Sequence, residues 1–146
     1  MPNEQGHDNV VRDLGGKKGH TMLTDNDFDQ IRAVVTLYLD GMFWGEPEKL
    51  RQAFHPKATA TGHYQGSYWN NPRDEFIVDW MAEETLSPGA PHSAGLTFVD
   101  VTGDMAMAKV TGRCLGDDYT DFLTLIKDSG QWQITHKAWF AHPTAE

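Results

Sequence analysis

Four strand-like segments follow one another in the last third of the chain, with very few residues between them. They cover residues 96–102, 105–115, 119–127 and 131–141, and are joined by Gly103-Asp104, Gly116-Asp117-Asp118 and Asp128-Ser129-Gly130. Connections of two to four residues can join only neighbouring antiparallel strands. The sequence therefore predicts a four-stranded meander, and every other element must pack against it.

The segments before the meander have the apolar period of helices. A first helix is predicted between Thr24 and Trp44, where apolar residues recur every three or four positions: Phe28, Ile31, Val35, Tyr38 and Met42. Pro47 predicts the start of a short second helix, because proline is favoured at the first helical position. A third helix is predicted after Asn71-Pro72 and carries Phe76, Ile77, Trp80 and Met81.

A short hairpin is expected between the second and third helices. Residues 57–69 alternate small and polar side chains, and Gly66 allows a turn. The order helix, helix, hairpin, helix and meander predicts an α+β domain, with the helices segregated on one face of the sheet.

The length of the chain, 146 residues, is that of one domain. We expect that single domain to span residues 21–146. Residues 1–20 are polar, contain four glycines and have no periodic apolar stripe. They are therefore predicted to form a flexible N-terminal arm.

Composition and missing motifs exclude several classes of function. The 21 acidic and 12 basic residues give a net charge of −9, which disfavours nucleic-acid binding. No apolar run reaches the roughly 20 residues of a membrane span, and no signal peptide is expected. A lone cysteine, Cys114, predicts a cytoplasmic protein without an internal disulfide. Neither metal-ligand spacings nor phosphate-binding loops occur, so we expect no metal and no cofactor.

Two groups of short motifs carry a family resemblance. One comprises Tyr38-Leu39-Asp40-Gly41, Gly45-Glu46, Leu50 and residues 53–58, and the other comprises residues 119–125 and 130–134. Over residues 24–141 the chain resembles the nuclear transport factor 2-like superfamily, most of all its lumazine-binding, polyketide-cyclase-like branch. The resemblance implies a cone-shaped fold, in which a strongly curved antiparallel sheet wraps around the three helices. It also implies an apolar pocket at the open end and a homodimer.

The resemblance singles out Tyr38 and Asp121 as candidate catalytic residues. They match a tyrosine and an acid of the ketosteroid isomerases, where the tyrosine donates a hydrogen bond to a developing oxyanion. The acid is kept protonated there by an apolar setting. The alternative is structural: Tyr38 would be a core aromatic, and Asp121 would hydrogen-bond a helix or loop.

The catalytic base of those isomerases has no counterpart in this chain. The matching position is Gly62, which cannot abstract a proton. A histidine would have to replace the missing aspartate, since histidine titrates near neutral pH. Two histidines are candidates: His63, which would need a bulge at Gly62 to point inward, and His136, which has the strand parity of Trp132 and Ile134.

The 16 aromatic residues are explained equally well in two ways: they form a pocket that stacks on a flat ring, or they fill the cone and cover the dimer face. The candidate ligand-binding residues are Tyr64, Trp69, Trp80, Phe98, Tyr119 and Trp139. Our first hypothesis is a binding protein for a small apolar or aromatic molecule. The second is a cofactor-free lyase or isomerase, of dehydratase or cyclase type, that uses Tyr38, Asp121 and a histidine. The third is an interaction module whose own aromatic residues fill the pocket.

Overall fold

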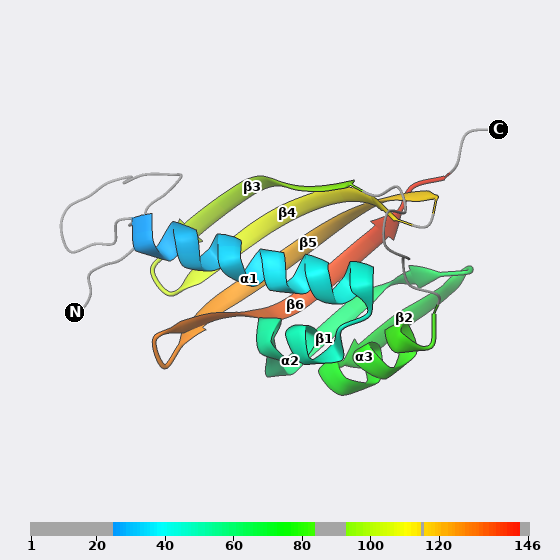
Figure 1. The fold of residues 1–146 in the computed structure, drawn as a ribbon, viewed down its shortest axis with the longest axis horizontal. Coiled ribbons are helices and arrows are strands. Elements are labelled where there is room, and N and C mark those ends of the chain that lie inside the picture. Colours follow the sequence, from blue (N-terminus) through cyan, green and yellow to red (C-terminus); the bar gives the residue numbers. More distant parts are fainter. Residues whose placement is uncertain (1–24, 84–92, 115, 144–146) are drawn as a thin grey trace.

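The computed structural model describes residues 25–83, 93–114 and 116–143, and these form three helices and a six-stranded sheet (Figure 1). The predicted arm, residues 1–20, lies outside them. In chain order the elements are α1 (Asp25–Trp44), α2 (Pro47–Ala53), β1 (Phe54–Tyr64), β2 (Ser67–Pro72), α3 (Arg73–Met81), β3 (Ser93–Thr102), β4 (Met105–Cys114), β5 (Asp117–Asp128) and β6 (Gln131–Ala141). The predicted α+β class and the meander β3–β6 are confirmed.

One pair of strands departs from the predicted antiparallel order. The sheet runs β2-β1-β6-β5-β4-β3, and β1 pairs with β6 in parallel. Parallel neighbours need a long connection between them. Here that connection contains β2, α3 and the first three strands of the meander, so the first and last long strands of the chain lie side by side.

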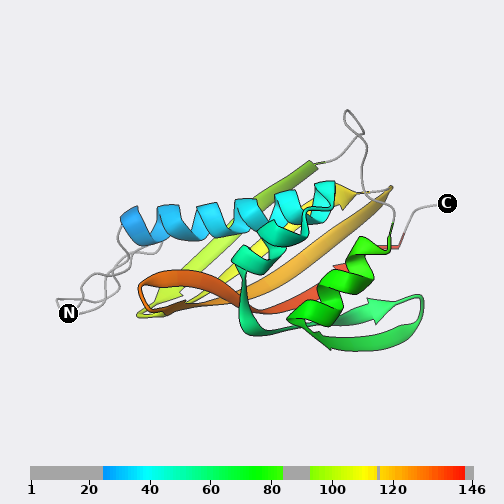
Figure 2. The ribbon, with the colours of Figure 1, turned by 60° about the horizontal axis from the view of Figure 1, so that its bottom comes forward.

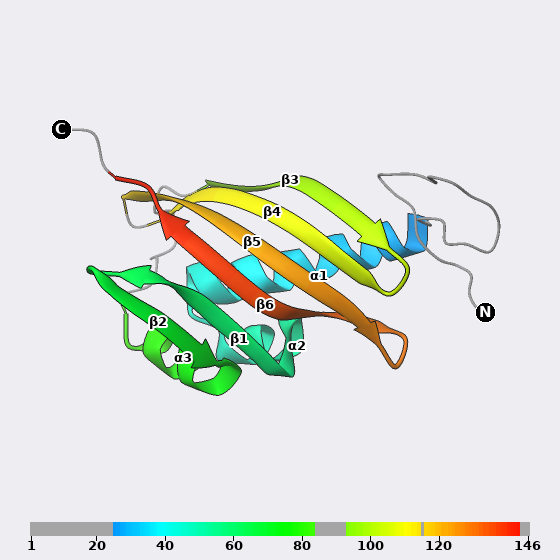
Figure 3. The same ribbon diagram turned by 180° about the vertical axis from the view of Figure 1, so that it is seen from behind.

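The helices lie on one face of the curved sheet. Helix α1 crosses the concave face and α3 lies beside β1 and β2, whereas the opposite face carries no helix (Figures 2 and 3). The predicted stripe of α1 is buried in the core, where Ile31, Val35 and Tyr38 are almost inaccessible to solvent. Among the described residues, no helix is both long enough and apolar enough to span a membrane.

Strand β6 contains a bulge that inverts the direction of its side chains. Leu125 of β5 pairs with Ile134, but the preceding Thr124 pairs with His136, so β6 has one extra residue. An extra residue moves all later side chains to the other face. Trp132 and Ile134 are buried before the bulge, and Lys137 is buried after it. The expectation that His136 points to the same face of the sheet as Ile134 is therefore wrong.

A buried acid joins the first turn of α1 to the end of the sheet. The Oδ1 atom of Asp27 accepts hydrogen bonds from Nζ of Lys127, at 3.0 Å, and from Nε1 of Trp132, at 3.1 Å. Both donors flank the β5–β6 turn. This arrangement holds one end of the long helix against the sheet, while the other end of the helix borders a cavity.

Candidate functional site

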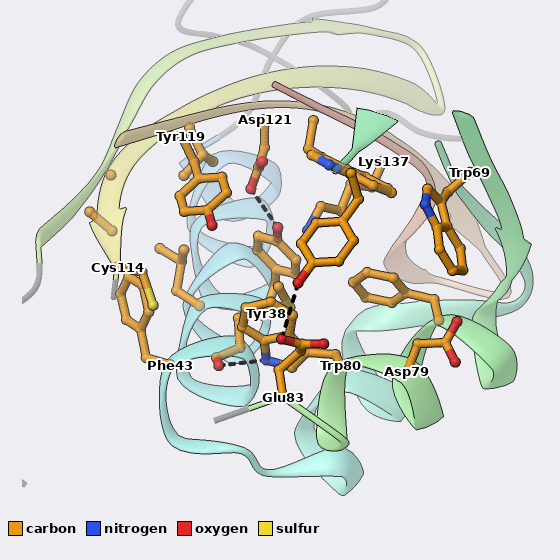
Figure 4. A pocket seen from close by; sticks show the side chains of 18 of the residues that line it. Tyr38, Phe43, Trp69, Asp79, Trp80, Glu83, Cys114, Tyr119, Asp121 and Lys137 are labelled. Carbon is orange, nitrogen blue, oxygen red and sulfur yellow. Dashed lines mark hydrogen bonds between the residues drawn. The ribbon is translucent and has the colours of Figure 1, made fainter. Parts of the chain in front are cut away.

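A cavity of about 300 Å³ lies between α1, α3 and the concave face of the sheet (Figure 4). Most of its wall is aromatic or aliphatic: Tyr38, Leu39, Met42, Phe43, Tyr64, Trp69, Phe76, Trp80, Val110, Tyr119 and Trp139. Two buried charged residues, Asp121 and Lys137, also reach it, whereas Asp79 and Glu83 are exposed. An apolar cavity with a few polar groups is typical of a small-molecule site.

Tyr38 and Asp121, the two residues that the resemblance singled out, both line this cavity. The hydroxyl of Tyr38 on α1 donates a hydrogen bond of 2.5 Å to Oδ2 of Asp121 on β5. Burial, and then the charge of Asp121, raises the pKa of Tyr38 well above its usual value, so the hydroxyl keeps its proton. A hydroxyl has one proton to donate. In this arrangement Asp121 receives it, and Tyr38 can only accept a hydrogen bond from a ligand.

The position of the missing isomerase base is filled by an indole ring. A Cβ atom on Gly62 would lie 2.3 Å from Cε2 of Trp139, which is the neighbour of Gly62 across the β1–β6 pair. The indole is held there, because its Nε1 donates to the backbone oxygen of His63 at 3.2 Å. Gly62 therefore accommodates Trp139, and no side chain at position 62 can reach the cavity without displacing that ring.

Neither candidate histidine lies in the cavity wall. The pairing of β1 with β2 is regular from Thr59 to Tyr64, so there is no bulge at Gly62 to turn His63 inward. His63 is exposed and its ring packs edge-on against Tyr68. The Nδ1 atom of His136 lies 2.8 Å from Oγ1 of Thr59, away from the cavity. Among the described residues, then, no histidine supplies the base of the lyase hypothesis.

The sequence reasoning missed the residue that does enter the cavity, Lys137. Its side chain is only 4% exposed, and Nζ lies over the rings of Tyr38 and Phe76, at 5.0 and 4.8 Å from their centroids. Burial lowers the pKa of Lys137, and the charge of Asp121 opposes this effect only in part. In the sequence Lys137 stands between His136 and Ala138, so no apolar pattern marked it as an inward-facing residue. The bulge that turns it inward left no mark in the sequence.

Five of the six predicted ligand-binding residues line the cavity: Tyr64, Trp69, Trp80, Tyr119 and Trp139. Two of these are also tied to neighbouring elements, because Tyr64 donates to Glu83 at 3.3 Å and Trp80 donates to the oxygen of Met42 at 2.8 Å. Burial raises the pKa of Tyr119 to about 12. Phe98 is the exception. It is 51% exposed and does not reach the cavity, because its neighbour Val99 is the residue of β3 that points inward.

The described residues contain no group of three histidine, cysteine, aspartate or glutamate side chains that could hold a metal ion. The buried polar groups that reach the cavity are instead the amine of Lys137, the carboxylate of Asp121 and the phenol of Tyr38. These can hydrogen-bond a ligand and move protons.

Known proteins resemble this chain along most of its length. The model of the family described as "Putative lumazine-binding" matches residues 26–140. Aldolase FrzH of Cladobotryum sp. is 27% identical over 83% of this chain and 96% of its own. An NTF2-like protein of unknown function from Silicibacter pomeroyi DSS-3 has a TM-score of 0.75 and 30% identity over 83% of this chain and all of its own. An NTF2-like protein from Shewanella baltica OS155, with a TM-score of 0.74 and 24% identity, covers 82% of this chain and 96% of its own, and it supports the fold.

Proposed function

The chain belongs to the family described as "Putative lumazine-binding", and from this premise we propose that it binds a small, flat, largely apolar molecule in its cavity. The observation that carries the proposal is the open, aromatic-walled cavity of about 300 Å³ with a buried amine and a buried carboxylate. The aromatic residues of the third hypothesis stand in the wall of this space rather than filling it, which favours binding over a pure interaction module.

The side chains of the cavity wall indicate which kind of ligand would fit. The rings of Trp139 and Phe76 offer apolar surface beside Nζ of Lys137, so a flat ring with an acceptor oxygen at one end matches both. Lumazine, a flat bicyclic ring with carbonyl groups, fits this description and is named by the family. It is therefore the first ligand to test.

Binding can be measured by thermal shift and by quenching of tryptophan fluorescence. A ligand at one hundred times its dissociation constant adds about 2.7 kcal/mol to the free energy of unfolding. We expect lumazine or 2-naphthalenemethanol to raise the melting temperature and to quench the fluorescence. Trp69→Ala should weaken binding, because Trp69 lines the cavity, and Phe98→Ala is the matched control on the opposite face. Equal affinity in both variants, or no binding by any flat ring, would contradict the proposal.

A cofactor-free lyase activity is the second candidate function. It is favoured by the relative named aldolase FrzH, which this chain matches over 96% of that protein's length. Lyase chemistry beside a carbonyl group needs a base and a proton donor. With His63 and His136 outside the cavity, Lys137 is the nitrogen that could act with Tyr38 and Asp121. Turnover of a carbonyl substrate that falls in Tyr38→Phe while binding persists would support this candidate.

A further inference from the structure

We propose that Lys137 is a nucleophilic amine that captures an aldehyde or ketone in the cavity as an iminium adduct. The inference rests on the proposed function, because the carbonyl compound must enter the same cavity. It adds the chemical class of the ligand and the atom with which it reacts.

The position of Lys137 in the sheet removes its side chain from water. Its cross-strand neighbours are Leu123 on β5 and Ala60 on β1, and the same row continues through Ala108 to Val99. All four of these residues are buried. Lys137 is therefore the one polar member of an inward-facing apolar row, and the bulge in β6 is what places it there.

The surroundings of the nitrogen favour the neutral amine. Nζ lies 4.8 to 5.5 Å from the ring centroids of Tyr38, Phe76 and Trp139, and these ring faces attract an ammonium. Against this, Nζ has no hydrogen bond or ion pair with any described residue. A buried ammonium without a paired anion is unfavourable. Asp121 on β5 and Cys114 on β4 would favour the charged form, but burial outweighs them and lowers the pKa of Lys137.

A lysine that gives up its proton more readily than usual, in a cavity with a largely apolar wall, is suited to carbonyl chemistry. The lone pair of Nζ attacks the carbonyl carbon, the π electrons move to oxygen, and a proton passes from nitrogen to that oxygen to give a carbinolamine. Uptake of one proton from solvent lets the hydroxyl group leave as water, while the nitrogen lone pair forms the C=N⁺ bond. The Tyr38–Asp121 pair lies in the same cavity and can accept a hydrogen bond from the hydroxyl group of the carbinolamine and from the water that leaves.

The test is reductive trapping with 2-naphthaldehyde and sodium cyanoborohydride near pH 7. Cyanoborohydride delivers hydride to the iminium carbon and leaves a stable secondary amine, which is located by peptide mass mapping. We expect one naphthylmethyl group, on Lys137. It should be added at least tenfold faster than on any other lysine, because the fraction of an amine that is neutral rises tenfold for each tenfold weakening of its proton binding. Lys137→Met should abolish the labelling, and Lys57→Met, which removes an exposed lysine of the adjacent strand, should leave it unchanged.

Two further measurements use the unmodified protein, so they do not depend on whether the Lys137→Met variant folds. The alcohol 2-naphthalenemethanol has the same ring as the aldehyde but no carbonyl group. It should compete with the aldehyde for the cavity of the unmodified protein and so protect Lys137 from labelling.

Three outcomes would overturn the inference. If this alcohol binds but labelling is spread over exposed lysines, the inference is overturned while the proposed function stands. If 2-naphthoate binds more tightly than the alcohol and the aldehyde labels nothing, Lys137 acts as an ammonium and the inference is overturned. If the alcohol does not bind and Lys137 is not labelled, the proposed function is contradicted as well.

Discussion

At the scale of single residues, the ring of Trp139 occupies the space that a side chain on Gly62 would need. The indole lies where a side chain on residue 62 would begin, so an aromatic ring forms the wall at this position. The ring makes the site more apolar and leaves no room for an acidic side chain on residue 62.

Gly62→Asp should therefore destabilise the protein without creating an isomerase. Forcing extra atoms into a packed site costs about 1–3 kcal/mol, and chemical denaturation would measure that loss. Gly62→Asp combined with Trp139→Ala is the control, because removal of the indole should restore part of the stability. A single variant that is as stable as the parent and isomerises a steroid would refute this account.

The pH dependence of stability provides a second prediction at this scale. Because burial lowers the pKa of Lys137 below its ordinary 10.5, the unfolded chain binds more protons than the folded one between the two values, and stability rises with pH across that window. Lys137→Met removes this term. It should stabilise the protein near neutral pH, by about 1.4 kcal/mol for each tenfold change in proton binding.

The advantage of Lys137→Met should shrink as the pH rises toward 10.5. Urea denaturation of both proteins from about pH 7 to about pH 9.5 would test this, and an advantage independent of pH would contradict it. The upper limit matters because the pKa values of Tyr38 and Tyr119 are raised. The unfolded chain loses tyrosine protons from about pH 10, which lowers the stability of both proteins there.

Residue identity predicted part of this site and could not predict the rest. Tyr38 and Asp121 were each singled out by the family resemblance, and a hydrogen bond joins them although 83 residues separate them in the chain. Lys137 was missed, and His136 was expected to face inward, because side-chain direction along a strand follows parity only while the pairing is regular. The bulge depends on how β6 fits between β1 and β5, which no local pattern in β6 records.

At the scale of elements, Asp27 anchors α1 to the β5–β6 turn. Asp27→Ala should destabilise the protein by about 1–3 kcal/mol, because the buried indole nitrogen of Trp132 loses its acceptor. Asp29→Ala, on an exposed position of the same helix, is the matched control and should change stability by less than about 0.5 kcal/mol. Thermal unfolding would measure both variants, and similar losses in the two would show that Asp27 is not an anchor.

The elements with strong local signals were predicted well. Pro47 begins α2, and β6 spans the predicted residues 131–141. The weaker signals failed at boundaries: the hairpin was expected over residues 57–69, but β1 already begins at Phe54 and includes Pro56. Proline is tolerated there because Pro56 falls where the β1–β6 register is interrupted, between Phe54 and Thr59, and needs no ladder hydrogen bond.

At the scale of the whole molecule, one face of the sheet carries no helix (Figure 3), and several large apolar side chains are exposed on the outward-facing positions of its strands. Phe98 and Phe122 lie in one cross-strand row, separated by Lys109, and Met107 and Phe140 are also exposed. Exposed apolar patches of this kind mark interaction surfaces. We predict a homodimer through this face, with an interface on the order of 1,600 Å².

Sedimentation velocity would measure the mass in solution. The parent protein should sediment as a dimer at micromolar concentration, and Phe122→Asp should dissociate it by burying an unpaired charge. Val78→Asp, at an exposed apolar position on α3, is the control and should leave the dimer intact. A parent protein of about 16 kDa at all these concentrations would contradict the prediction.

The parallel contact of β1 with β6 has a consequence for biosynthesis. During translation, β1 and β2 leave the ribosome long before residues 131–141, which form the strand that joins them to the meander. Until then, the β1–β2 hairpin and the β3–β5 ribbon are separate pieces with unpaired edges. Such edges are open to pairing with other chains. In a nascent chain of this architecture, the edges of β1 and β5 that β6 will cover therefore stay unpaired until the last strand has been synthesised.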